Sequence, residues 1–351
     1  MNEYGIDISN FTFLIVIKIM MHKILSIGEL LLRFESVENS NSSSNNIFAN
    51  YPGGSEANVA VALSALDIPV SYFTVIPDNS LAENAIDKIQ DAGVDTSSIL
   101  KKEGRLGLYF LQDPNGLTKG EVIYDRKYSS FYSVEEKEID WNSIFGDCTW
   151  LHWTAITPAL SDKWAHLMKQ CLEEAKKRNL FISVDLNYRN KLWNYGKFPL
   201  EIMPDLVQSC DLIMGNIWAS NKMLGTSITD ELNRNTTKKE YFIYAQKVSK
   251  ELFSIYPKCK HIANTFRFMD NSNHNLLYGT YHTPKGNWQS ESLETNVLVD
   301  RIGSGDAFMS GLIFAICKEY SPQETIDFAT SIGFKKLFIK GDFYQKNNIT
   351  L

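Results

Sequence analysis

The sequence predicts an α/β protein with a doubly wound, mostly parallel sheet that is flanked by helices and carries a small β-sheet flap. Short apolar strands alternate with amphipathic helical segments over most of the 351 residues, the pattern of parallel strands joined by crossover helices. Between residues 105 and 133 the helical pattern stops, and two alternating strands surround an Asp-Pro-Asn-Gly turn. Hydrophobic residues make up 44% of the chain, which supports a sizeable core.

The periodicity of apolar residues places the elements along the chain. Short apolar runs that end in glycine or polar residues predict buried strands, and apolar residues three or four positions apart predict helices. A Ser/Asn-rich stretch at 38–46 predicts a surface loop. The strands are expected at 23–28, 70–75, 149–153, 180–185, 211–215 and 261–265, and the helices at 57–66, 81–92, 163–178, 307–320 and 322–336.

One domain is expected over residues 21–351, with its flap made from about 30–52 and 103–132. The preceding residues 1–20 form an extension that we expect to be dispensable. Its apolar segment Phe11–Met21 is shorter than the roughly 20 residues that span a bilayer, and it has no basic leader or small-residue cleavage site. We therefore expect no membrane attachment.

Charge and cysteine content exclude several classes of function. The chain has 35 Lys and Arg against 41 Asp and Glu, and it has no long basic run, so nucleic acid is not an expected partner. Its five cysteines are scattered, with no CxxC or Cys/His cluster, so neither a disulfide framework nor a structural zinc site is expected. Free thiols favour the cytoplasm.

The strongest chemical motif is DRIGSGDAFMSG at 300–311. Gly303, Ser304 and Gly305 precede an apolar helix, where free N–H groups and the helix dipole can bind an anion. Asp306 is itself negative and suits a different role, that of the base for a hydroxyl attacking a phosphoryl group held by those amides. In the alternative interpretation the glycines form a simple turn and Asp306 is a helix N-cap.

A second motif is YPGGSEANVAVA at 51–62. Gly53 and Gly54 allow a backbone to approach a ligand closely, and Asn58 offers both a donor and an acceptor to hydroxyl groups. The stretch is not a GxGxxG fingerprint, which disfavours a dinucleotide-binding oxidoreductase. A glycine turn capped by Ser55 or Asn58 is the alternative.

Together, Gly28-Glu29 after the first strand, the Gly-Gly…Asn element and the late GSGDAF loop resemble the PfkB carbohydrate kinases, over about residues 22–345. The resemblance implies a ribokinase-like core, a β-lid that closes on the sugar, ATP and Mg²⁺ as cofactors, and direct phosphoryl transfer. The implied site residues are Asp306 as base, Gly303, Ser304 and Gly305 as anion hole, and Gly53, Gly54 and Asn58 as sugar ligands.

The stretch VDLNYRNKLW at 184–193 resembles the DxNxR segment of 2-keto-3-deoxygluconate kinases. It follows a strand, so Arg189 is expected at the carboxyl edge of the sheet, where its planar fork suits a carboxylate. Tyr109, Tyr124 and Arg126 on the flap match positions where those kinases contact substrate. Alternatively, Arg189 pairs with a structural aspartate and Arg126 is solvated.

The nucleotide end departs from the family pattern. Asn187, Asn216 and Asn264 are the expected nucleotide contacts, but Ala219 stands where a family NxxE motif has Glu. We therefore assign no protein ligand to the metal, and expect Mg²⁺ to be held by ATP oxygens and water. The usual Gly-rich stretch after the next strand is also absent, and Arg301 replaces a common Thr; it is either a phosphate contact or a surface residue.

These observations predict a cytoplasmic kinase that phosphorylates the C6 hydroxyl of an acidic keto-sugar, 2-keto-3-deoxygluconate. A fructokinase or ribokinase-like enzyme on a neutral sugar is the first alternative, and a non-catalytic sugar-binding relative is the second. A homodimer or higher homo-oligomer is expected, because the lids of such kinases often pair across subunits.

Overall fold

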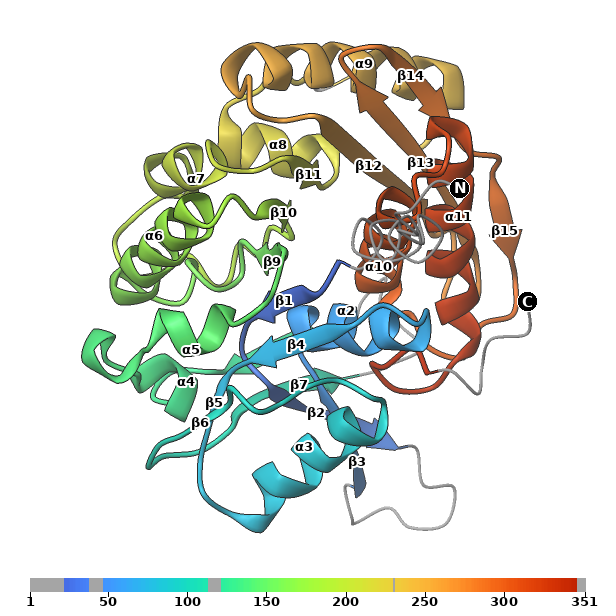
Figure 1. The fold of residues 1–351 in the computed structure, drawn as a ribbon. Coiled ribbons are helices and arrows are strands. Elements are labelled where there is room, and N and C mark those ends of the chain that lie inside the picture. The colour runs from blue at the N-terminus through green and yellow to red at the C-terminus, as the bar shows by residue number, and fades with distance from the viewer. Residues whose placement is uncertain (1–21, 38–46, 113–120, 230, 346–351) are drawn as a thin grey trace, which may run out of the picture.

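The computed structural model describes residues 22–37, 47–112, 121–229 and 231–345. The expected extension at 1–20 and the Asp-Pro-Asn-Gly turn lie outside these residues. Figure 1 shows a central sheet between two helical layers, with a second, smaller sheet beside it. The predicted α/β fold class is confirmed.

Parallel pairing dominates the nine-stranded main sheet, whose order is β14-β13-β12-β11-β10-β9-β1-β4, with β15 also paired to β13. All pairs from β4 to β12 are parallel, and β13, β14 and β15 extend the sheet with antiparallel pairs that the sequence did not lead us to expect. The parallel strands are β1 (Ile24–Ile27), β4 (Val70–Phe73), β9 (Trp150–Thr154), β10 (Phe181–Asp185), β11 (Leu212–Met214) and β12 (His261–Phe268). The antiparallel strands are β13 (Asn275–Thr283), β14 (Gly286–Gln289) and β15 (Leu293–Thr295).

The strand order reverses direction at β1. The chain passes from β1 to β4 on one side, and then places β9 through β12 on the other side. Ligands of open α/β sheets bind at the carboxyl ends of the strands next to such a switch point. The topology therefore places a binding site beyond the ends of β1, β9 and β10.

Two hydrophobic clusters cover the two faces of the sheet. One face packs against α6 (Asp162–Lys177), α7 (Pro199–Val207), α8 (Ile217–Leu224) and α9 (Lys238–Ile255), together with the short α4 (Ser130–Ser133) and α5 (Trp141–Phe145). The opposite face packs against α2 (Ser55–Ala65), α3 (Ser80–Asp91), α10 (Ser304–Cys317) and α11 (Pro322–Lys335). None of the described helices is long and apolar enough to cross a membrane.

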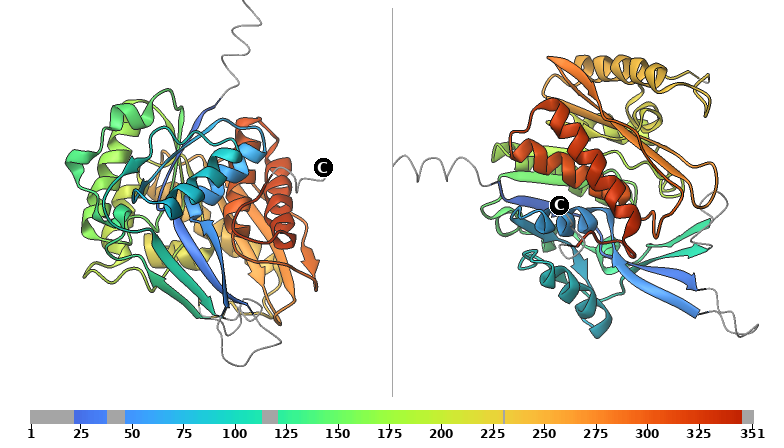
Figure 2. Two further views of the ribbon diagram at one scale, coloured as in Figure 1. Left: turned by 90° about the horizontal axis from the view of Figure 1, so that it is seen from below. Right: turned by 90° about the vertical axis from the view of Figure 1, so that its right-hand side faces the viewer.

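The second sheet has the order β3-β2-β7-β8 and projects from the body of the molecule (Figure 2). Its strands are β2 (Leu31–Val37), β3 (Ile47–Gly53), β7 (Gly107–Gln112) and β8 (Glu121–Asp125). Side chains alternate between its faces, as strand geometry requires. Arg33 and Tyr109 are buried on the inner face, whereas Phe48 and Ile123 are exposed on the outer face. A short pair, β5 (Val75–Ile76) and β6 (Leu100–Lys101), completes the strands.

Candidate active site

A cleft of about 910 Å³ lies between the small sheet and the carboxyl edge of the main sheet. Residues at or just after the carboxyl ends of the parallel strands form one wall of the cleft, because all of these ends lie at the same edge of the sheet. The end of β1 contributes Glu29, β9 leads to Ile156, β10 contributes Asp185, and β11 leads to Asn216. The cleft therefore has a β1–β10 end under the small sheet and a β11–β12 end away from it.

Asp306 lies between these two ends, in the first turn of α10. Ser55 Oγ donates to its Oδ1 at 2.6 Å, and Asn58 Nδ2 donates to its Oδ2 at 2.7 Å. Burial raises the pKa of Asp306 above its usual value, and these two hydrogen bonds oppose that rise. The carboxylate is fixed in place, and each oxygen keeps a second lone pair for another donor.

Asn58 and Ser55 come from α2, which Gly54 starts with a φ of 142° that favours glycine. The Oδ1 atom of Asn58 is buried and has no hydrogen-bond partner among the described residues. Asn187 Nδ2 donates to Ser55 Oγ at 2.9 Å, which extends the chain of contacts that ends at Asp306. Gly53, expected to touch the sugar, packs against Asp342 and does not line the cleft.

The start of α10 is the segment in which the anion hole is predicted. Gly303 is left-handed at φ 80°, and a Cβ there would lie 2.4 Å from the backbone oxygen of Asp342. Around a Cβ built on Gly305 there is no atom within 4 Å, so this turn faces open space. Ser304 Oγ donates to Gly333 O at 2.8 Å, which leaves only its backbone for a ligand. The N–H groups at the start of the helix precede its hydrogen-bonded ladder and are suited to an anion.

Two further carboxyl groups line the cleft near Asp306. Burial raises the pKa of Glu56 to about 7, although Thr154 donates to Oε1 at 2.6 Å and Thr157 at 3.2 Å. Burial, followed by the charge of Asp306, raises the pKa of Asp185 to about 7. Glu56 was not predicted, and Ser55 was considered only as a cap of the glycine turn, because no local pattern shows which helix residues face a cleft formed by distant segments.

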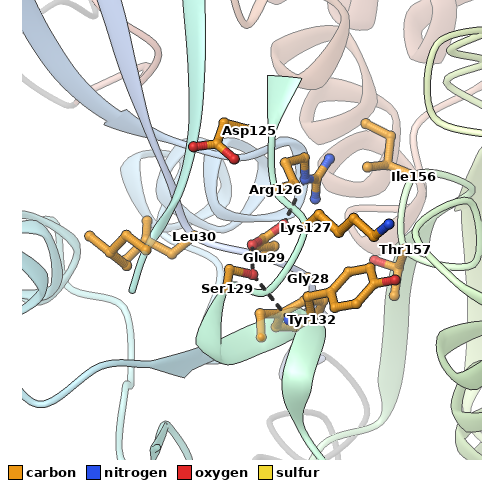
Figure 3. A network of polar contacts seen from close by, with 12 residues as sticks. Gly28, Glu29, Leu30, Asp125, Arg126, Lys127, Ser129, Tyr132, Ile156 and Thr157 are labelled. Carbon is orange, nitrogen blue, oxygen red and sulfur yellow. Dashed lines mark hydrogen bonds and ion pairs between the residues drawn. The ribbon is translucent and has the colours of Figure 1, made fainter. Parts of the chain in front are cut away.

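The flap residue Arg126 is not a free cation. Its Nε donates to Glu29 Oε2 at 2.6 Å, and Ser129 Oγ donates to Oε1 of the same carboxylate at 2.5 Å. Figure 3 shows Arg126 and Ser129 converging on Glu29 from the segment that follows β8. Arg126 is 5% exposed and lines the cleft, so the alternative that it is solvated is wrong, while its contact with substrate stays a prediction.

Tyr109 and Tyr124 both line the cleft from neighbouring strands of the small sheet, with ring centroids 6.3 Å apart. Tyr109 donates its hydroxyl to Asp342 Oδ2 at 2.7 Å. Asp342 also forms a 3.0 Å ion pair with Arg33 Nε. The small sheet is thus tied to the late segment that also packs on the Gly53 and Gly303 turns.

Arg33 is fully buried and pairs with three carboxylates. It donates to both oxygens of Asp300, at 3.2 and 2.7 Å, and lies 3.5 Å from Glu35 as well as 3.0 Å from Asp342. Asp300 opens the loop that leads to the anion hole. This network therefore joins β2 of the small sheet to the loop in front of Asp306.

Arg189 and Asn216 lie in the cleft, whereas Asn264 does not. Arg189 is exposed, with Nη1 donating to Tyr188 O at 3.1 Å, and its charge acts on Asp185 and Asp306. Asn216 caps α8 through a 2.8 Å bond from Ala219 N.

Asn264 is 1% exposed, donates to Gly215 O at 2.9 Å and accepts from Thr280 at 3.3 Å. The next residue, Thr265, faces the cleft instead, because side chains alternate along β12. The side chain of Asn264 therefore lies outside the cleft, where it supports the wall through Gly215, while the contact predicted at Asn216 stays a prediction.

The β11–β12 end of the cleft contains residues that the sequence analysis missed or left open. Thr265, Arg267 and Met269 line it from β12 and the residue that follows, and Trp218 lines it from α8. Arg301 also lines it and is 3% exposed rather than on the surface. The alternation of Thr265, Arg267 and Met269 is visible in the sequence, but β12 runs to Phe268 rather than ending at 265.

The described residues contain no group of three or more His, Cys, Asp or Glu side chains that could hold a metal ion. Mg²⁺ prefers octahedral oxygen ligands and often takes only one or two carboxylates, with phosphates and water supplying the rest. Asp185 is a cleft carboxylate available for that role. These residues fit a cation that arrives with a nucleotide, and they do not form a protein cage.

Comparison with known sequences finds carbohydrate kinases. The family model described as pfkB family carbohydrate kinase matches residues 21–251. A 2-dehydro-3-deoxygalactonokinase from Haloferax volcanii is 26% identical over 175 residues, which are 50% of this chain and 55% of that protein. The match thus spans about half the length of this relative.

Solved structures agree with this assignment. A 2-dehydro-3-deoxygluconokinase from Thermotoga maritima superposes with a TM-score of 0.82 at 27% identity, over 92% of this chain and 96% of that chain. A PfkB family carbohydrate kinase from Listeria grayi gives a TM-score of 0.79 at 30% identity, over 92% and 96% of the two chains. With a family model that covers more than half of its length and a fold shared with solved members, the chain belongs to the PfkB family of carbohydrate kinases.

Proposed function

We propose that this protein transfers a phosphoryl group from ATP to the C6 hydroxyl of an acidic keto-sugar, 2-keto-3-deoxygluconate. The observation that carries the proposal is the Asp306 carboxylate, held by Ser55 and Asn58 beside the open turn at Gly305. A base adjacent to an anion hole has a use in phosphoryl transfer, whereas a protein that only binds sugar needs no such base.

In this proposal the sugar occupies the β1–β10 end of the cleft under the small sheet. Asn58 Oδ1, a buried acceptor without a partner, accepts from a sugar hydroxyl. Asp306 takes the proton of the C6 hydroxyl as its oxygen forms a bond to the γ-phosphorus. The bond from that phosphorus to the β–γ bridging oxygen breaks, and ADP leaves with the electron pair. The N–H groups at the start of α10 stabilise the charge on the transferring phosphoryl group.

Arg189 is the proposed ligand for the carboxylate of the substrate. It is exposed in the cleft, and its Nη1 donates a hydrogen bond to the neighbouring backbone carbonyl of Tyr188. A planar guanidinium can bind both oxygens of a carboxylate, which a sugar without that group does not offer. The lid role of the small sheet is part of the same proposal, since Tyr109 and Tyr124 cover the sugar end.

ATP with Mg²⁺ is the proposed phosphoryl donor, with Asp185 and water completing the ligands of the metal. When bound, Mg²⁺ neutralises part of the phosphate charge. The nucleotide occupies the β11–β12 end, where Trp218 offers an aromatic face 37% exposed. Asn216 and Asn187 stay proposed contacts near the phosphates.

A kinase of a neutral sugar is the second candidate, and one observation favours it. Arg126, expected as a second cation for the substrate carboxylate, is already paired with Glu29. A neutral sugar needs no second cation, and the Glu29–Arg126 pair can then serve to shape the cleft wall.

The test is ADP release by the purified protein with Mg·ATP and 2-keto-3-deoxygluconate, its galactonate epimer, fructose, ribose or no sugar. Turnover on the acidic sugars alone supports the proposal, and the epimer then refines the substrate. Turnover on fructose or ribose would keep the kinase activity, reject the acidic substrate and favour a kinase of a neutral sugar. Binding of sugar with no turnover on any member of the panel contradicts the kinase proposal and favours the non-catalytic relative.

We also propose that two copies pair through the outer face of the small sheet. Phe34 and Phe110 stack there with centroids 5.5 Å apart, and Phe48 packs edge-on at 6.3 Å while remaining 40% exposed. Exposed clusters of this kind mark interaction surfaces. Light scattering should give a dimer for the wild type and a monomer for Phe48→Asp; a wild-type monomer at micromolar concentration contradicts the pairing.

A further inference from the structure

The β11–β12 end of the cleft holds a positive charge with no carboxylate partner among the described residues. Arg267 lines the cleft from β12, is exposed there, and forms no ion pair or hydrogen bond with the described residues. The other cleft arginines differ from it, since Arg126 is bound to Glu29 and Arg189 bonds a carbonyl in its own loop.

A second arginine, Arg301, also belongs to this wall and is 3% exposed. Its Nη2 donates to Ser272 O at 2.6 Å and to His274 O at 3.0 Å, which fixes the turn after β12. Its Nε and Nη1 are buried and have no hydrogen-bond partner among the described residues. A buried guanidinium without a carboxylate beside it adds positive potential to its surroundings.

The charges of these residues act on one another. Desolvation by the surrounding protein, followed by the like charges of Arg301 and Arg189, lowers the pKa of Arg267 to about 10. The side chain nevertheless reaches the open cleft. Arg267 therefore stays positive at neutral pH. Only Asp306 is an opposing charge among these influences. Cations held together in this way are stabilised when an anion binds between them.

The position of Arg267 along the sheet selects the anion. A carboxylate on the sugar is expected at the β1–β10 end, under the small sheet, whereas β12 lies two strands beyond β10. The Gly303–Gly305 turn and Asp306 line the same cleft as Arg267, and the charge of Asp306 acts on Arg267. A phosphate chain that starts at this turn and leads away from the sugar is therefore expected to reach Arg267. A bidentate arginine matches phosphate oxygens.

We propose that Arg267 binds the β- and γ-phosphates of ATP and stabilises the leaving ADP, with Arg301 as the buried cation of the same wall. This assignment rests on the kinase function proposed above. As the bond between the γ-phosphorus and the bridging oxygen breaks, negative charge moves onto the β-phosphate, and Arg267 is placed to neutralise it. Arg267 is thus a catalytic residue that touches the reacting phosphates, and Arg301 is a positioning residue.

The experiment compares wild type, Arg267→Met, Arg267→Lys and the matched control Arg234→Met. Arg234 forms an ion pair with Asp270 at 2.7 Å beside the same turn but does not line the cleft. Binding of Mg·ATP, Mg·ADP and adenosine is measured by calorimetry or competition without sugar, and kcat and both KM values are measured with the best sugar. Melting curves check that each variant is folded.

We expect Arg267→Met to weaken ATP and ADP binding by roughly 10- to 100-fold and to lower kcat by roughly 10²–10³-fold, with adenosine binding unchanged. Arg267→Lys, which keeps the charge but loses the fork, should fall between Met and wild type. Arg234→Met should stay within about twofold of wild type, since an exposed ion pair contributes little.

Three results overturn the assignment. Unchanged ATP affinity and kcat in Arg267→Met removes Arg267 from the site and leaves the kinase function standing. A raised KM for sugar with unchanged ATP affinity assigns Arg267 to the sugar carboxylate instead. A wild type that binds no ATP overturns both proposals, whereas ATP binding that depends on Arg267 without turnover on any sugar contradicts the proposed function alone.

Discussion

The small sheet and the β11–β12 end of the cleft differ in whether carboxylates neutralise their arginines. In and just after the strands of the small sheet, Arg33 and Arg126 are buried with carboxylates that neutralise them. At the β11–β12 end, Arg267 and Arg301 have no carboxylate partner among the described residues. A paired charge shapes a rigid wall, while an unpaired one attracts a ligand of opposite sign. The difference shows that counting arginines is not enough to find the binding site of an anionic ligand, because only those without a carboxylate partner have a charge left to neutralise.

The largest expected effect is at Asp306, where the two ends meet. Asp306→Asn keeps the size of the side chain but removes the proposed base, and kcat should fall by roughly 10²–10⁴-fold. Sugar and ATP affinities, measured by calorimetry, should change little. If kcat stays within about tenfold of wild type, the base assignment fails.

The next effect tests the buried ion pairs of Arg33 through the stability of the protein. Arg33→Met leaves Asp300 and Asp342 buried without their cation, and the free energy of unfolding should fall by about 3–5 kcal/mol. Arg267→Met should change the same quantity by less than about 0.5 kcal/mol, because Arg267 is exposed and unpaired. Denaturant titration of both variants measures the contrast, and equal losses would break the comparison.

A smaller effect concerns selectivity. Arg189→Ala should lower kcat/KM for 2-keto-3-deoxygluconate by roughly 10- to 100-fold, the value of a charge-assisted hydrogen bond, and should alter turnover of a neutral sugar much less. Paired kinetic assays on the two sugars give the ratio. Equal losses on both would show that Arg189 supports the site without binding a carboxylate.

The smallest effect is the pH dependence of stability that follows from the raised pKa of Glu56. Its pKa of about 7 lies above its unfolded value, so the folded state binds more protons between about pH 4.5 and 7. Its contribution to stability is present below that window and is lost as the pH rises through 7, by at most about 1.4 kcal/mol per pH unit.

Glu56→Gln keeps acceptors for Thr154 and Thr157 and removes the titration. Melting temperatures of the variant and the wild type should therefore diverge between pH 5 and pH 8, with the variant more stable at the higher pH. A constant difference in melting temperature between the two proteins across this pH range would contradict the raised pKa of Glu56.

The fold was predictable where local signals agree with the tertiary structure. The alternation of β1, α2, β4 and α3 follows directly from apolar periodicity. Helix α9 (Lys238–Ile255) was missed although Thr237 and Glu240 form a capping box that the sequence displays. The antiparallel β13–β15 edge was missed because its pairing depends on which strand happens to lie beside β12.

The candidate site was predictable only in its local motifs. The turns at Gly54 and Gly303 and the position of Asp306 follow from glycine spacing and chemistry. The Glu29–Arg126 pair joins residues 97 positions apart, and no local pattern signals such a partner. The same limit applies to Ser55, whose contact with Asp306 spans 251 positions.

Asp342 packs against the turns at Gly53 and Gly303 and bonds Tyr109 and Arg33. Every other residue of the cleft precedes it in the chain, so the ribosome delivers Asp342 after all of them. A nascent chain can form its sheet and helices before this residue appears, but the two glycine turns then have nothing between them to set their spacing. The wall of the cleft is therefore completed only when one of the last described segments of the chain has been synthesised.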